Sequence, residues 1–134
     1  MEEKRPKLGS AVLVEHEGKF LLGERNKDNY RGRWIIPGGG VGWGETIKQA
    51  GIREIREETG LDVELVRFIC YKEIMNLPEN YHTVTFYHFA RPRQTNIRVG
   101  DDLSKAGFFS LEEIKKMNIA ESVEMVLREA GFWK

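Results

Sequence analysis

The sequence has few of the features that stabilise small secreted proteins or anchor proteins in membranes. Its one cysteine, Cys70, cannot form an internal disulfide and lies in an apolar run, where a buried, unreactive thiol is expected. No segment approaches the roughly 20 consecutive apolar residues of a membrane span, and no export signal follows the charged N-terminus. These absences exclude a disulfide scaffold, argue against membrane partners and favour a reducing, cytoplasmic location.

The charge balance also narrows the functional classes. Lys plus Arg and Asp plus Glu both number 21, and this neutrality argues against general nucleic-acid binding. Hydrophobic residues form 40% and charged residues 31% of the 134 residues, as in ordinary soluble globular proteins. The length predicts a single domain spanning residues 1–134.

Apolar periodicity predicts an irregular mixture of strands and helices. Two apolar-rich runs, at 10–15 and 19–25, flank a turn and predict a β-hairpin. Further strands are expected at 34–36, 63–72, 82–90 and 107–109, helices at 46–59, from 110 and at 120–130, and polar loops at 26–33 and 91–105. Because strands and helices do not alternate regularly, the pattern favours the α/β (α+β) class, with a mixed sheet flanked by helices.

The helix at 46–59 carries an unusual group of acids. At about 100° per residue, Glu54 and Glu58 lie on either side of the apolar Ile47, and Glu57 lies at the edge of that arc. Three carboxylates that are close together and partly desolvated repel each other unless a cation compensates them. Arg53 can pair with Glu57 but cannot neutralise all three acids. Mg²⁺ or Mn²⁺ would resolve the repulsion, whereas a solvated acidic face is the alternative.

The loop before this helix is rich in glycine. Its backbone can approach a ligand closely and point carbonyl groups at an ion. It leads into a helix N-terminus, where anionic groups are favoured. The glycines are Gly38, Gly39, Gly40, Gly42 and Gly44. This loop and the acidic helix together favour metal binding over a solvated acidic face.

The segment from Gly39 to Leu61 resembles the Nudix box at every defining position. Gly39 is followed after five residues by Glu45, and after seven more by the run REIREETGL at 53–61. The order of the surrounding elements, a leading hairpin and a C-terminal helix, is also similar to that of the family. The resemblance implies an α/β/α sandwich that hydrolyses a nucleoside diphosphate linked to another group.

The resemblance also assigns roles within the box. It implies that the carbonyl of Gly39 and the carboxylates of Glu54, Glu57 and Glu58 hold one or more Mg²⁺ ions, for which Mn²⁺ can substitute. It implies that Arg53 orients a metal-binding glutamate. The positions expected to support the site are Gly38 and Glu45. The general base differs between subfamilies, and Glu54 is a carboxylate that can take the proton of the attacking water.

Residues outside the box are candidates for substrate binding. We favour Arg25, at the end of a strand, over Arg31 and Arg33 as a contact for phosphates. Trp34 is either a core anchor or a stacking wall for a base. Tyr81 and His82, at the start of a strand, are candidates for contact with a base or phosphate, with a structural polar role as the alternative for each. A further metal ligand is sought among Glu79, Asp101 and Asp102, between which the sequence does not decide.

The substrate is expected to be a nucleoside triphosphate, oxidised ones included, that yields a nucleoside monophosphate and diphosphate. The segments 21–39 and 79–89 resemble members with this activity. A GDP-mannose type of nucleotide-sugar hydrolase and an ADP-ribose pyrophosphatase are the alternatives, and the complete box favours attack at phosphorus. A nucleotide-binding regulatory module is the non-enzymatic alternative. The apolar segment 63–71 and the C-terminal Phe132 and Trp133 predict a homodimer.

Overall fold

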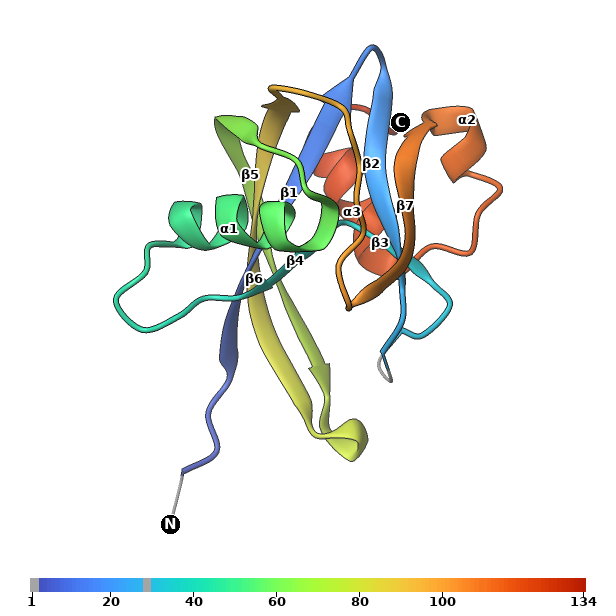
Figure 1. The fold of residues 1–134 in the computed structure, drawn as a ribbon. Coiled ribbons are helices and arrows are strands. Elements are labelled where there is room, and N and C mark those ends of the chain that lie inside the picture. Colours follow the sequence, from blue (N-terminus) through green and yellow to red (C-terminus); the bar gives the residue numbers. More distant parts are fainter. Residues whose placement is uncertain (1–2, 28–29) are drawn as a thin grey trace.

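The computed structural model describes residues 3–27 and 30–134. Its elements, in chain order, are β1 (Lys7–His16), β2 (Lys19–Arg25), β3 (Trp34–Ile35), β4 (Gly38–Gly40), α1 (Ile47–Thr59), β5 (Val63–Asn76), the short 3₁₀ helix η1 (Leu77–Glu79), β6 (Tyr81–Pro92), β7 (Leu103–Ser110), α2 (Leu111–Ile114) and α3 (Glu121–Glu129). The expected mixed sheet with flanking helices is confirmed (Figure 1).

The sheet is ordered β3-β2-β1-β6-β5, with β4 paired to β1 and β7 to β2. The predicted hairpin of β1 and β2 is present, but the two strands pair only at Glu15 with Phe20 and His16 with Lys19. Beyond the turn they separate, and β1 pairs in parallel with β6 and antiparallel with β4. The separation admits β4, which carries the glycines of the box, into the sheet.

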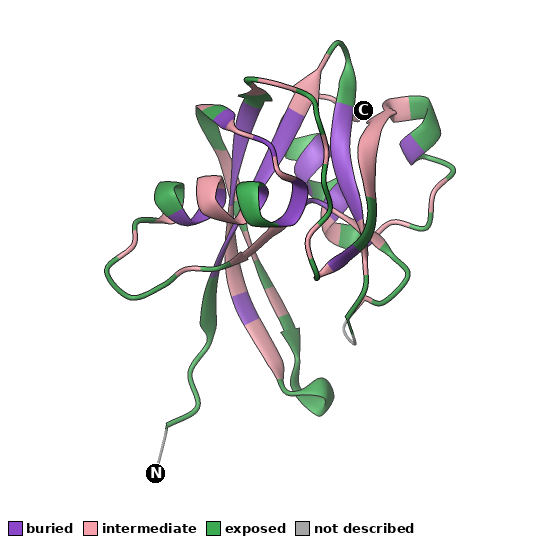
Figure 2. Ribbon diagram, in the orientation of Figure 1, coloured by how far each residue is buried: buried purple, intermediate pink, exposed green. Residues whose placement is uncertain are grey.

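Helices α1 and α3 cover opposite faces of the sheet (Figure 1). On the α1 face, Val12, Leu21 and Ile55 pack in one buried cluster. On the α3 face, Leu13 and Leu127 belong to a second cluster. Each fully buried aliphatic side chain of this kind stabilises the fold by about 1.5–3 kcal/mol. The buried segments therefore follow the middle of the sheet and the inner sides of the helices (Figure 2).

Several element boundaries differ from the sequence prediction. The glycines 38–40, expected as a loop, form strand β4 because they pair with β1. Strand β5 continues to Asn76, and the loop expected at 91–105 is shorter because β6 ends at Pro92 and β7 begins at Leu103. The early part of β7 is polar and pairs with β2, a non-local contact that apolar periodicity does not reveal.

The helices predicted near the C-terminus agree more closely with the structure. Ser110 and Glu113 form the expected capping box, although α2 is a single turn. Phe132 packs its ring against Phe20 at 4.9 Å, so it contributes to the core rather than to a free surface. Among the described residues, no helix has the length and apolar character needed to cross a membrane.

Candidate active site

Local sequence signals fix the helix that carries the acids. The Thr46 hydroxyl accepts a hydrogen bond from the Gln49 amide at 3.0 Å, and the Gln49 side chain accepts one from the Thr46 amide at 2.9 Å. This capping box starts α1 where the sequence predicted. Gly60 ends the helix with a φ of 75°, a left-handed conformation that glycine adopts without strain.

Strand β4 brings bare backbone against α1. Gly38, Gly39 and Gly40 pair with Ala11, Ser10 and Gly9 of β1, respectively. A β-carbon at Gly38 would overlap the backbone of β1, and one at Gly39 would overlap the carboxylate of Glu54. A side chain at Gly39 would therefore displace the Glu54 carboxylate from the strand.

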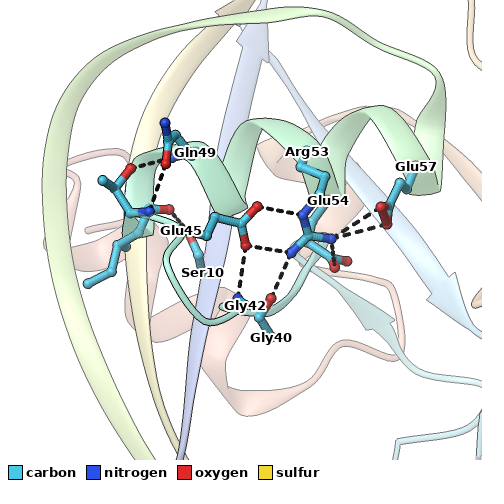
Figure 3. A network of polar contacts seen from close by, with 10 residues as sticks. Ser10, Gly40, Gly42, Glu45, Gln49, Arg53, Glu54 and Glu57 are labelled. Carbon is cyan, nitrogen blue, oxygen red and sulfur yellow. Dashed lines mark hydrogen bonds and ion pairs between the residues drawn. The ribbon is translucent and has the colours of Figure 1, made fainter.

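Arg53 joins Glu45, Glu54 and Glu57 in one network of hydrogen bonds (Figure 3). Its Nε and Nη2 atoms donate to the two carboxylate oxygens of Glu45 at 2.7 and 2.9 Å. Nη1 donates to Glu54 at 2.7 Å and to both oxygens of Glu57 at 3.2 Å, and Nη2 also donates to the Gly40 carbonyl at 2.9 Å. The predicted pairing of Arg53 with Glu57 is therefore part of a larger network.

The pKa values follow this network. The hydrogen bonds from Arg53 lower the pKa of the Glu45 carboxyl to about 2. The same contacts, led by that with Glu45, raise the pKa of Arg53 above its usual range. Burial raises the pKa of Glu54, and the hydrogen bond from Arg53 opposes that rise. Glu45 and Arg53 are thus a fixed ion pair that holds the acids of the box in place.

Glu58 is the most buried acid of the box, with a relative exposure of 3%. Its Oε2 accepts a hydrogen bond from the Gly38 amide at 3.0 Å, while no described residue hydrogen-bonds its buried Oε1. Burial, followed by the charges of Glu54 and Asp102, raises the pKa of Glu58 to about 8. Its Oε1 is therefore available for a cation, whose binding would displace the proton that the metal-free carboxyl holds.

The donor set fits a divalent cation because it consists of carboxylate and carbonyl oxygens. As the side chains stand, no three His, Cys, Asp or Glu residues within 3–27 and 30–134 converge closely enough to hold an ion. The Nη1 atom of Arg53 lies against both Glu54 and Glu57. The Glu57 side chain is 56% exposed and therefore has room to turn toward Glu58.

The segment before β7 holds the C-terminal end of α1. The Arg98 amide donates to the Thr59 carbonyl and the Gly100 amide to the Glu58 carbonyl, both at 2.8 Å. A β-carbon at Gly100 would overlap the carbonyl oxygen of Glu57. Sequence reasoning missed this position because nothing local marks a glycine that packs on a distant helix.

The structure places two of the three candidate loop ligands, Asp102 and Glu79, in very different positions. Asp102 forms an ion pair with Lys27 at 2.8 Å, and its charge acts on both Glu54 and Glu58. Glu79 belongs to η1, at the far end of the hairpin formed by β5 and β6 (Figure 1). Asp102 is thus a loop carboxylate whose charge reaches the acids of the box.

A cavity of about 240 Å³ lies on the other side of β4. Its walls combine glycine backbone, tyrosine rings, hydroxyl groups and two basic residues. The described lining consists of Lys7, Leu8, Gly9, Ala11, Arg25, Tyr30, Ile35, Ile36, Gly38, Gly39, Gly40, Ile74, Tyr81, Thr83, Thr85, Tyr87, Ala120 and Ser122. Strand β4 therefore forms one wall of the cavity and also contacts the acids of α1.

The predicted substrate residues fall into two groups. Arg25 and Tyr81 line the cavity. Trp34 does not belong to the described lining and packs its ring edge-on against Phe109 at 5.1 Å, which favours the core anchor of the two roles considered. The Arg33 guanidinium lies 5.8 Å from the centre of the Tyr30 ring. Tyr30 was not singled out from the sequence, because only the folded loop brings it to the cavity.

Comparison with known proteins identifies the family to which the chain is similar. Residues 5–128 match the family model described as the NUDIX domain. A solved structure, the MutT NUDIX hydrolase from Burkholderia pseudomallei, superposes with a TM-score of 0.87 at 25% identity, covering 94% of this chain and 98% of that one.

Two curated proteins are similar over different lengths. An ADP-ribose pyrophosphatase of Methanocaldococcus jannaschii is 29% identical over 91% of this chain and 71% of its own length. An oxidized purine nucleoside triphosphate hydrolase of Danio rerio is 44% identical over 47% of this chain and 40% of its own length. The Methanocaldococcus jannaschii protein is therefore similar over most of this chain at lower identity, and the Danio rerio protein over about half of it at higher identity.

Proposed function

The chain belongs to the Nudix family and is a hydrolase of pyrophosphate bonds in nucleotide derivatives, and on this premise we propose that it cleaves a nucleoside triphosphate. The products are a nucleoside monophosphate and inorganic diphosphate. The observation that carries the proposal is the position of β4, with the acids of α1 on one side and the cavity on the other. A nucleoside bound in the cavity would direct its phosphates past the glycine backbone of β4 toward the acids.

Residues of the chain account for binding and orientation. Glu54, Glu57 and Glu58, with the carbonyl of Gly39, would hold a divalent cation such as Mg²⁺ or Mn²⁺. When bound, that ion neutralises phosphate oxygens and lowers the pKa of the attacking water. Arg25, on the wall of the cavity, donates hydrogen bonds to phosphate oxygens.

Proton transfer completes the reaction. The oxygen of water attacks the α-phosphorus in line, and the bond from that phosphorus to the bridging oxygen breaks as diphosphate leaves. Glu54 takes the proton of the water, and its raised pKa brings it closer to the pH at which a general base works best. Arg53 keeps the Glu54 carboxylate in position through their 2.7 Å hydrogen bond.

The size of the cavity favours a triphosphate over ADP-ribose. At about 240 Å³ it is below the range of roughly 300–1,000 Å³ typical of ligand pockets, so it suits one nucleoside without a second sugar. The local likeness to the Danio rerio triphosphate hydrolase supports the same choice. The broader likeness to the archaeal ADP-ribose pyrophosphatase supports the alternative, and a GDP-mannose type of reaction is disfavoured by the complete box.

A panel of substrates tests the proposal. We expect kcat/KM for at least one nucleoside triphosphate to exceed those for ADP-ribose and a nucleotide sugar, with activity lost in a chelator and restored by Mg²⁺ or Mn²⁺. A kcat/KM for ADP-ribose about tenfold above every triphosphate would reverse the assignment. Binding of nucleotides without turnover of any of them would instead support a regulatory module.

A further inference from the structure

The cavity has two chemically different ends. Strand β1 enters at Lys7, which pairs with Thr83, and reaches Ala11 beside Gly38 four residues later. At roughly 3.3 Å per residue, the two ends are about 13 Å apart along the strand. This span suits a nucleoside 5′-phosphate whose phosphorus lies beside Gly38, where the acids of α1 also lie, and whose base extends toward Lys7.

The floor between the two ends is kept open by Gly9. A β-carbon there would lie 2.7 Å from Thr85 Oγ1 and 3.3 Å from Thr83 Cγ2. Because glycine has none, the side chains of both threonines remain available on the same face of the sheet as the cavity. The floor thus has room for a flat ring and hydroxyl groups beside it.

Three tyrosines also line the cavity, and one of them, Tyr87, continues the floor beside Thr85 on β6. Tyr30, Tyr81 and Tyr87 lie close enough for Tyr81 to raise the pKa of both other phenols, although burial is the larger cause in each case. Tyr87 is buried, but the partly exposed rings of Tyr30 and Tyr81 offer surfaces on which any base can stack. A phenol or threonine hydroxyl both donates and accepts hydrogen bonds, so these groups do not by themselves distinguish one base from another.

Lys7 differs from the groups around it because an ammonium group only donates hydrogen bonds. It belongs to the cavity lining at the end remote from Gly38. A base with a carbonyl oxygen on its outer edge can accept a hydrogen bond from this ammonium. An exocyclic amino group in the same place presents hydrogens to a donor and is left unpaired.

We propose that Lys7 selects the base of the substrate, favouring the keto bases uracil, thymine and guanine over the amino bases cytosine and adenine. This inference rests on the proposed function, because it assumes that the phosphates lie beside Gly38. The ammonium charge of Lys7 also disfavours bases that carry a positive charge. Lys7 is therefore a specificity-determining residue, outside the Nudix box and at the opposite end of the cavity from the acids.

Matched pairs of substrates test the selection directly. We expect kcat/KM to be about tenfold higher for UTP than for CTP, and for GTP than for ATP. Lys7→Met should bring both ratios close to one, and Lys7→Glu should invert them, because a carboxylate accepts hydrogen bonds from amino groups. Lys7 is exposed, so neither change should disturb folding, which thermal unfolding checks.

A control and a second measurement separate the possible failures. Lys19→Met removes an exposed ammonium beside the turn between β1 and β2 and should leave both ratios unchanged. Hydrolysis with equal ratios in the wild type, or ratios unaffected by Lys7→Met, would overturn the selection while the proposed function stands. If no triphosphate is hydrolysed, the proposed function fails, and calorimetric binding of UMP and CMP decides about Lys7: tighter UMP binding that Lys7→Met abolishes supports it, and equal binding overturns it.

Discussion

The carboxylate of Glu54 occupies the space in which a β-carbon at Gly39 would lie. Gly39 is not among the glycines with a positive φ. Glycine is therefore required here because a side chain would not fit, and not because of the backbone conformation. The carbonyl at this position and the carboxylate of Glu54 are both among the groups expected to hold the cation. Their close approach is thus a condition for the site.

Gly39→Ala should damage activity more than stability. The added methyl group would displace Glu54 or part β4 from α1, and a shift of about 1 Å in a catalytic group can lower the rate about 100-fold. We expect kcat at saturating Mg²⁺ to fall by about that factor. Gly42→Ala is the matched control, because its β-carbon would meet only Glu45 Oε1, at an ordinary 3.4 Å. Similar kcat values for the two variants would show that the contact is unimportant.

Glu57→Gln tests whether this acid binds the cation. The change keeps size and shape but removes the charge, so we expect kcat to fall by two or more orders of magnitude, about 2.7 kcal/mol of transition-state stabilisation. The metal-free protein should remain folded and melt no lower, because one of three crowded negative charges is gone. The stabilisation that Mg²⁺ adds to the native state should shrink.

Gln49→Glu is the control for this variant. It adds an acid to the same helix, and glutamate can replace glutamine in the capping box with Thr46. We expect kcat to stay within a few-fold of wild type. Near-wild-type activity for Glu57→Gln at saturating Mg²⁺ would mean that the acids form only a solvated face. The proposed metal site would then be wrong.

The acidic helix could be predicted from sequence because its signals are local. Thr46, Gln49 and Gly60 lie next to the ends that they fix, and the helical period places Glu58 on the buried side. The sequence also predicted the pairing of Arg53 with Glu57. It did not predict the two hydrogen bonds to Glu45, since they depend on the path of the loop between β4 and α1.

The rest of the site depends on contacts between distant segments. Gly38 is a strand residue only because Ala11, on β1, pairs with it. Gly100 packs on α1 from a segment more than 40 residues further along the chain. Tyr87 and Ser122 meet across the cavity through a hydrogen bond between β6 and α3. Periodicity and turn signals carry no information about such pairs, so the cavity could not be predicted from the sequence.

The exposed edge of β5 predicts a dimer in solution. This 14-residue strand lies at the edge of the sheet and exposes apolar side chains, a surface suited to pairing with another strand. These side chains are Val66, Phe68, Tyr71 and Met75. Light scattering should give twice the chain mass of 15.5 kDa. Tyr71→Lys should shift the mass toward the monomer, whereas Met125→Lys, on α3, should not.

If light scattering detects only a 15.5 kDa species at micromolar concentration, the predicted dimer is wrong. The C-terminal residues Phe132 and Trp133, first considered as part of the same interface, are less suited to it. Phe132 packs on Phe20, and Trp133 lies against Lys115 and Arg128. The edge of β5 is therefore the surface that the light-scattering variants address.

The buried carboxyl of Glu58 should make the stability of the metal-free protein depend on pH. Burial raises its pKa in the folded chain from 4.5 to about 8, so the folded state retains a proton that the unfolded state releases. The stabilisation from this proton is complete below about pH 4.5 and is lost as the pH rises toward about 8. The free energy of unfolding in excess chelator should therefore fall across this window.

Glu58→Gln isolates this effect because the amide is neutral at every pH and its oxygen can still accept the Gly38 hydrogen bond. Between about pH 5 and pH 8, the variant should gain stability over wild type on the order of 2–4 kcal/mol in urea unfolding with chelator. His88, whose pKa burial lowers, contributes the opposite slope, but it is present in both proteins and cancels in the difference. Mg²⁺ should reverse the order by stabilising only wild type, since a neutral amide is a poor ligand for it. Parallel pH profiles for the two proteins in chelator would show that Glu58 is not protonated in the folded chain.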